Sequence, residues 1–190
     1  LQALDRTIPV VGSPGAIKVA QSLHYQQAIA LEHGETYAQL AGVTIKALPG
    51  SPIGPQLVEN GYLIEDLTSG HKLYYEPHGY HAPSLKQETP IDVAIVPIVD
   101  LKLPLLGPII RGQEQALKLC EWLHPQVIVP TAAGGDVQFS GLLTVLLSSE
   151  GEAAAFQKML ADKGLSTEVL DPKPGERIPL NLEPHPASRR

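Results

Sequence analysis

Apolar positions along this chain fall into short runs typical of buried strands and longer runs with helical spacing. Four short runs predict strands, and they cover residues 8–13, 27–31, 43–48 and 91–96. The last run is almost continuously apolar, as expected for a strand covered on both faces of a sheet. The third run meets Pro49-Gly50, so we expect it to end in a turn there.

Later segments predict a hairpin, four helices and two further strands. Residues 60–65 and 72–75 flank a polar loop that contains Gly70, a pattern that indicates a hairpin. Ser13 and Pro14 fit the N-cap and first position of a helix. The helices are predicted at residues 14–23, 112–123, 142–147 and 152–160, and the two strands at 127–129 and 167–170. Helical spacing in the second helix places Ala116, Leu119, Cys120 and Leu123 on one apolar face, where Cys120 would be a small buried hydrophobe.

The alternation of strands and helices over 190 residues predicts one domain, residues 1–182, followed by a disordered tail, residues 183–190. Residues 101–110 contain two prolines and a glycine and predict a loop. Its apolar side chains fit either a homodimer or partner surface, or a cover over the core. They are Leu103, Leu105, Leu106, Ile109 and Ile110.

Composition narrows the function classes. Hydrophobic content of 43% with 18% charged residues is ordinary for a globular protein in water. The formal net charge of −6 argues against non-specific binding to nucleic acid or to an anionic membrane. No apolar run approaches the roughly 20 residues that span a bilayer. The lone Cys120 excludes an internal disulfide and fits a reducing compartment, so we expect a cytoplasmic protein.

Three potential metal ligands follow the aromatic strand at residues 72–75. Glu76, His78 and His81 supply a carboxylate and two imidazoles, the donors that zinc, iron or manganese would use. No His-x-His, His-Glu-x-x-His or paired Cys-x-x-Cys motif accompanies them. The alternative is that Glu76 pairs with a cation or caps backbone amides, while the two histidines lie on a solvated loop.

Other side chains are candidates for a cleft. Tyr74 and Tyr75 point to opposite faces of their strand, so we expect one in the core and the other in the cleft. Arg111, at a helix start, fits either an anionic ligand or an ion pair with Glu114. Asp136 fits a substrate contact or, more simply, a cap of the following turn.

Short strings spread over nearly the whole chain resemble one known family. They are PVVGSP (9–14), LPG (48–50), ENGY (59–62), LYYEPH (73–78), GQE (112–114), VPT (129–131), GLL (141–143) and EG (150–151). By these strings the chain resembles the metallo-β-lactamase-fold superfamily, and within it the UlaG-like proteins of cyanobacteria and plant plastids. The resemblance implies an αββα sandwich of two mixed β-sheets with outer helices. It also implies bound zinc, iron or manganese and hydrolysis of esters, amides or phosphodiesters.

The resemblance carries over only in part to the metal ligands. The family's His-x-His-x-Asp-His motif precedes the strand at residues 8–13, so we expect part of one sheet to be missing and that strand to have an open edge. Ser51, also a cleft candidate, stands where the family has a histidine after a Pro-Gly turn, but it lacks a nucleophile elbow. Glu76 or His78 replaces the bridging aspartate, and Thr131 with Ala132 replaces the last histidine.

These residues lead to three hypotheses. The first is a metal-dependent hydrolase with degenerate ligands, one zinc, iron or manganese ion or none, and an unknown substrate. The second is an inactive pseudoenzyme that binds a small molecule or a protein partner. The third is an interaction module that uses the 101–110 loop, for instance as a homodimer. None involves nucleic acid or a membrane, and the location is the cytoplasm, or the plastid stroma in a plant relative.

Overall fold

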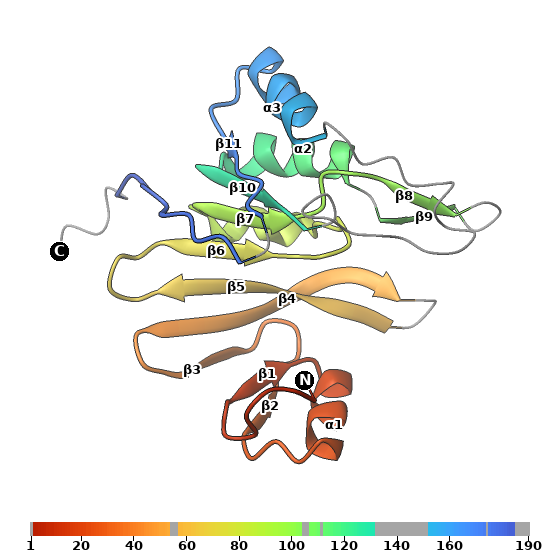
Figure 1. The fold of residues 1–190 in the computed structure, drawn as a ribbon, viewed down its shortest axis with the longest axis vertical. Helices are drawn as coiled ribbons and strands as arrows, with labels where there is room; N and C mark the ends of the chain where they lie inside the picture. Colours follow the sequence, from red (N-terminus) through yellow and green to blue (C-terminus); the bar gives the residue numbers. More distant parts are fainter. Residues whose placement is uncertain are drawn as a thin grey trace.

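A mixed β-sheet forms the centre of the molecule. The computed structural model describes residues 2–53, 57–103, 107–110, 112–131, 152–173 and 175–184. The strands of the main sheet are β3 (Thr36–Leu40), β4 (Val43–Ile53), β5 (Leu57–Asp66), β6 (Lys72–Tyr75), β7 (Val93–Val96), β10 (Val127–Pro130) and β11 (Glu168–Val169). Their order is β11-β10-β7-β6-β5-β4-β3 (Figure 1). Pairing is parallel from β11 to β6 and antiparallel from β6 to β3.

The main core lies between one face of this sheet and the outer helices. These are α2 (Gln113–Leu123) and α3 (Glu152–Asp162), with a 3₁₀ turn, η1 (Pro83–Glu88). The strands contribute Leu63, Tyr74, Val96 and Ile128, among others, to this core. The helices supply Ala116, Leu119, Cys120, Leu123, Phe156 and Leu160. Full burial of such a large apolar side chain contributes about 1.5–3 kcal/mol, so this face holds the fold together.

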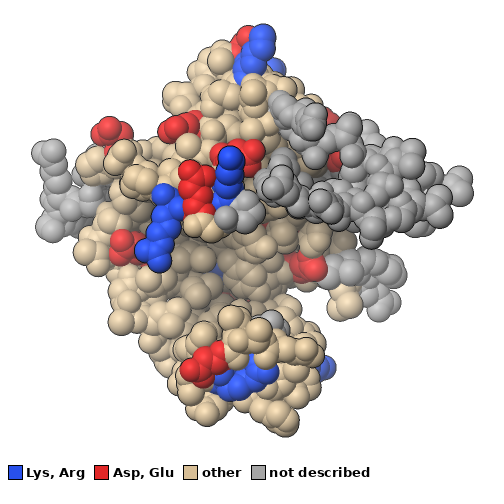
Figure 2. Space-filling view, viewed as in Figure 1, with Lys and Arg blue, Asp and Glu red and all other residues tan. Residues whose placement is uncertain are grey.

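A smaller unit precedes the main sheet. It consists of β1 (Val10–Gly12), α1 (Pro14–Ser22) and β2 (Ala28–Ala30), and β1 pairs with β2 in parallel. Ser13 caps the helix, because its hydroxyl accepts a hydrogen bond from the Ala16 amide at 3.4 Å. Within the described residues, β1 has no other strand partner. The molecular surface is hollowed between this unit and the main sheet (Figure 2).

Most predicted elements are present. Strands lie within residues 8–13, 27–31, 91–96 and 167–170, and the predicted hairpin is β5 and β6, with Gly70 at φ 76° in its loop. The apolar face predicted for α2 is buried, and Cys120 is a buried thiol as expected of a small hydrophobe. The predicted helix at 142–147 lies outside the described residues.

The prediction that a strand ends at Pro49-Gly50 is wrong, because β4 continues to Ile53. A register shift between Pro49 and Pro52 accommodates the prolines in the ladder with β5. Gly50 is needed there, since a Cβ at this position would lie 2.8 Å from the Gly61 amide nitrogen and 2.9 Å from the Glu59 carbonyl oxygen. A dipeptide that usually marks a turn therefore marks a bulge inside a long strand.

One further prediction needs correction, and one strand was missed. Residues 101–110 do not form only a loop, because β8 (Leu101–Leu103) and β9 (Gly107–Ile110) pair as antiparallel strands. A register shift lets Pro108 stand opposite Lys102. The side chains of this hairpin and residues 104–106 lie outside the described part, and so does the predicted apolar surface. The edge strand β3 was not predicted, since its residues are mostly polar and exposed.

The start of the predicted tail is held against the main sheet. Gln126, next to β10, donates from its side-chain nitrogen to the Glu183 carbonyl oxygen at 3.1 Å. Its side-chain oxygen accepts from the Glu183 amide at 2.6 Å. Residues 185–190 lie outside the described residues. Within the described part, no helix has the length and apolar character needed to cross a membrane.

Candidate functional site

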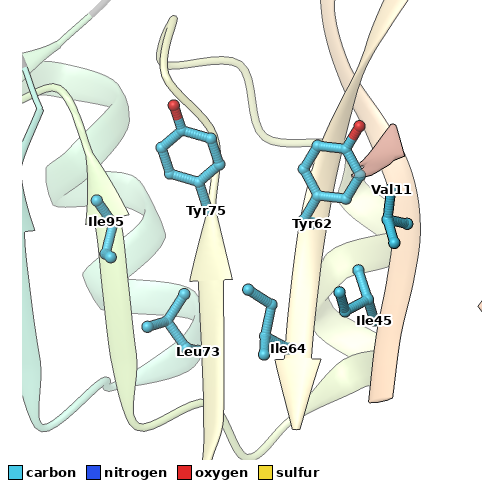
Figure 3. Close-up of a pocket in the computed structure, with 7 residues that line it drawn as sticks. All are labelled: Val11, Ile45, Tyr62, Ile64, Leu73, Tyr75 and Ile95. Carbon is cyan, nitrogen blue, oxygen red and sulfur yellow. The ribbon is translucent and has the colours of Figure 1, made fainter. Parts of the chain in front are cut away.

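An apolar cavity of about 320 Å³ lies on the face of the main sheet opposite the helices (Figure 3). Its lining comes from β4, β5, β6 and β7, with one residue from β1. These residues are Val11, Ile45, Tyr62, Ile64, Leu73, Tyr75 and Ile95. Apart from two phenol hydroxyls, the side chains of the lining are hydrocarbon, so the cavity suits an apolar occupant.

Strand alternation and register build this lining. Tyr62 stands opposite Tyr75 in the antiparallel pair of β5 and β6. Tyr75 is in turn in register with Ile95 on β7. Because successive side chains point to opposite faces, the neighbouring Tyr74 lies in the helix-covered core with 1% exposure. The two tyrosines therefore divide between core and cleft as the sequence predicted.

Both phenol hydroxyls lie at the same end of the cavity, toward the carboxyl end of β6 (Figure 3). The Asn60 side chain and the Ser13 backbone lower the pKa of Tyr62, but burial has the larger effect. Burial raises the pKa of Tyr62, and burial followed by the charges of Glu76 and Glu59 raises the pKa of Tyr75. Both hydroxyls are therefore protonated at neutral pH and can donate or accept a hydrogen bond.

Glu76 holds the turn that follows β6. Its side chain is fully buried, and Oε2 accepts hydrogen bonds from the amides of His78 at 3.2 Å and Tyr80 at 2.8 Å. The other oxygen, Oε1, is buried and has no hydrogen-bond partner in the part of the chain that the structure describes. The alternative reading of Glu76 as a cap of backbone amides is confirmed.

The two histidines of the same turn have separate partners. His78 Nδ1 lies 2.6 Å from Glu59 Oε2 at a partly exposed position. His81 is buried, and its Nδ1 lies 3.3 Å from the Tyr74 hydroxyl. Burial, with a smaller effect from Lys118, lowers the pKa of His81 to about 4, so this ring is neutral in the folded protein at neutral pH. The expectation that His81 lies on a solvated loop is wrong.

The three predicted ligands do not converge on one point. Among the described residues, no group of three or more His, Cys, Asp or Glu side chains is arranged to hold a metal ion. The side chains of the β6 turn therefore do not fit the ion that the resemblance implies, and we derive no reaction step through a metal. Their assignment as ligands, alone or with residues outside the described part, stays a prediction.

The remaining candidates are scattered. Ser51 is partly buried in β4 and does not line the cavity. Thr131 follows β10, where its amide donates to the Val96 carbonyl oxygen at 3.2 Å, and its buried hydroxyl has no hydrogen-bond partner among the described residues. Arg111 and Asp136 lie outside the described residues. Sequence reasoning missed Tyr62 as a partner of Tyr75, although the predicted hairpin and its alternation contained the signal.

Comparison with known proteins adds a family match. The family described as "Beta-lactamase superfamily domain" matches residues 4–132. No curated protein matches the chain.

Several solved structures share the fold at low sequence identity. An isothiocyanate hydrolase from Delia radicum gut bacteria has a TM-score of 0.64 at 14% identity, covering 94% of this chain and 69% of that protein. A candidate metal-dependent hydrolase from Parabacteroides distasonis ATCC 8503 has a TM-score of 0.57 at 16% identity, covering 86% of this chain and 64% of that protein. The metallo-β-lactamase-fold protein YhfI from Bacillus subtilis has a TM-score of 0.55 at 15% identity, with coverages of 86% and 61%.

These similarities establish the fold class that the sequence predicted, an α/β metallo-β-lactamase-like fold with mixed sheets and outer helices. The chain spans less than two thirds of the length of the Parabacteroides and Bacillus proteins. At these identities the shared fold does not transfer an activity.

Proposed function

Because the chain belongs to the β-lactamase superfamily, we propose that it is a hydrolase-like protein with degenerate metal ligation that binds a small molecule in its apolar cavity. The observation that carries the proposal is the contrast at the end of β6. There Glu76, His78 and His81 are engaged by separate protein groups, while the cavity beside them is lined by apolar side chains and two phenols.

The donor groups support degenerate ligation. A metal site requires ligands that are free and convergent. Glu76 instead uses one oxygen to hold its own turn, and His78 contacts Glu59. Ser51 and Thr131 stand where the resemblance implies histidines, and a neutral hydroxyl is a poor substitute for an imidazole.

The cavity supports binding. Its volume of about 320 Å³ falls at the lower end of the range for small-molecule sites, which are mostly apolar with a few placed polar groups. The phenols of Tyr62 and Tyr75 are such groups, since both hydroxyls lie at one end (Figure 3). A ligand of this size would be oriented by that end and would contact the apolar side chains of the rest.

Two measurements test the proposal. Metal content of the protein purified without chelators should stay well below one ion per chain, with no change in Glu76→Gln or His78→Ala. An NMR titration with ethylbenzene should shift amides of β5 and β6, and Leu73→Phe should abolish the shifts. About one ion per chain that disappears in Glu76→Gln would contradict degenerate ligation, and unshifted amides would contradict binding in the cavity.

A second candidate is a metal-dependent hydrolase with a single ion. It is favoured by two buried atoms without a hydrogen-bond partner among the described residues, Glu76 Oε1 and His81 Nε2. Further ligands would have to come from outside the described part. Hydrolysis that depends on added metal and is lost in Glu76→Gln would establish this candidate instead.

The proposal includes the finer expectations from the sequence. They are membership of the UlaG-like branch, a location in the cytoplasm or the plastid stroma, and binding to a second copy of the chain or to another protein. Sedimentation of the purified chain at several concentrations tests the homodimer, because a monomer at all of them would remove it.

A further inference from the structure

Only neutral side chains from the described part of the chain line the cavity. Five of these lining residues are aliphatic, and the other two are Tyr62 and Tyr75. A charged group that enters this space loses hydration and meets no opposite charge in the lining, which is costly. The cavity is therefore suited to an uncharged occupant.

The two phenol hydroxyls of the lining differ in their surroundings. The hydroxyl of Tyr62 lies against the N-terminal unit, since a Cβ on Gly12 would be 3.8 Å from it. The Asn60 side chain and the Ser13 backbone act on the same hydroxyl. The hydroxyl of Tyr75, at the cavity end toward which β6 runs (Figure 3), has no hydrogen-bond partner among the described residues. Tyr75 therefore holds a donor that an occupant of the cavity can use.

The apolar surroundings of this donor favour an acceptor that has no proton of its own. A carbonyl oxygen accepts a hydrogen bond and leaves no donor to be satisfied. A ligand hydroxyl could accept the same bond, but its own proton would then face hydrocarbon side chains without an acceptor, which costs free energy. A ketone or an ester avoids this cost.

We therefore propose that the cavity binds a neutral, ring-sized apolar molecule through a carbonyl oxygen that accepts a hydrogen bond from the Tyr75 hydroxyl, with the ring among Ile64, Leu73 and Ile95. The inference rests on the proposed function, since it names the ligand class of the same cavity. An apolar cavity of about 150 Å³ holds a benzene ring. A volume of about 320 Å³ accommodates one ring with a short substituent.

Three probes of similar size test the inference on the whole chain, with dissociation constants from NMR titration of the amides of β5 and β6. Acetophenone carries the carbonyl group. α-Methylstyrene has the same shape with a methylene group in place of the oxygen, and benzoate carries a negative charge. Benzoate should bind at least about tenfold more weakly than acetophenone, because its charge meets no opposite charge in the lining.

Matched variants locate the hydrogen bond. Tyr75→Phe should weaken acetophenone binding about fivefold, as for loss of one hydrogen bond between neutral groups, and should leave α-methylstyrene binding unchanged. Tyr62→Phe makes the same chemical change in the same lining. It should leave the ratio of the two dissociation constants unchanged, because the Tyr62 hydroxyl lies against the N-terminal unit.

The outcomes separate the two proposals. The carbonyl inference is wrong, while the cavity remains a binding site, if Tyr75→Phe leaves that ratio unchanged or Tyr62→Phe alters it as much. Benzoate binding as tightly as acetophenone would overturn the inference in the same way. If none of the three probes shifts the amides of β5 and β6, both the inference and the proposed function fail.

Discussion

The two faces of the main sheet are built from the same strands, but helices cover one face and a cavity lies on the other. On the helix-covered face, Tyr74, Ala94 and Val96 are at most 1% exposed. On the other face their chain neighbours Tyr75 and Ile95 are only partly buried and line a cavity. Apolar character is similar on both faces, so hydrophobicity alone does not separate a structural face from a binding face.

The difference lies in what covers each face. The helices α2 and α3 cover the first and bury its side chains in the main core, where removing even one methylene group has a cost. On the second face the described residues leave about 320 Å³ of space. A face with unfilled volume contributes less stability and can gain contacts from a ligand, whereas a filled face cannot.

The strongest test of this comparison is deletion of a large side chain on each face. Phe156→Ala on α3 should lower the free energy of unfolding by about 3–5 kcal/mol, because it removes a fully buried ring from packed surroundings. Ile95→Ala in the cavity lining should lower it by only about 1 kcal/mol, since part of that side chain is already exposed. Urea denaturation of both variants measures the difference, and equal losses would show that the cavity face is packed as well.

Acid should weaken the packed face through His81. Its pKa is about 4 in the folded protein and near 6.5 in the unfolded chain, so between these values the unfolded state binds more protons. The neutral His81 ring therefore leaves the free energy of unfolding at its full value above pH 6.5. This free energy declines as the pH falls and is about 3 kcal/mol lower below about pH 4.

His81→Gln isolates this contribution, because it removes the titrating group while keeping a polar side chain. The free energy of unfolding of this variant should fall less steeply between pH 6.5 and 4 than that of the wild type. Identical slopes in parallel urea titrations would show that His81 titrates normally in the fold.

Glu76 lies where β6 ends between the two faces, and its removal should have an intermediate effect. Glu76→Ala leaves the amides of His78 and Tyr80 without their acceptor and should cost about 2 kcal/mol. Glu76→Gln keeps one acceptor oxygen and should cost less than half as much. Thermal and urea unfolding of Glu76→Ala and Glu76→Gln measure which variant loses more stability. A stabilised Glu76→Ala would mean that the unpaired Oε1 outweighs both bonds.

The smallest effect is expected where a residue is enlarged beside the cavity rather than in the packed core. Ala94→Leu adds volume to the packed face and should cost about 1–3 kcal/mol. Leu73→Phe adds volume beside the cavity, where there is space, and should change the free energy of unfolding by less than about 1 kcal/mol. The comparison would fail if Leu73→Phe destabilised the protein as much as Ala94→Leu.

The sequence by itself determined most of the elements and the side on which residues of the predicted strands lie. Alternation in residues 72–75 divided Tyr74 from Tyr75, and helical spacing placed Cys120 in the core. The resemblance of short strings to a known family also implied the fold class. The elements and the sides of the strand residues depend on periodicities of the backbone, which a linear pattern records directly.

Tertiary structure alone decided the bulge in β4, the pairing of β8 with β9 and the chemistry at the end of β6. Whether Glu76, His78 and His81 converge depends on which partners the fold brings near each one, and Glu59 and the Tyr74 hydroxyl were brought close to the histidines. The cavity likewise exists because β1 lies near the open face of four other strands. Contacts between residues distant in sequence depend on strand register and packing, and the hydrophobic periodicity of the sequence reports neither.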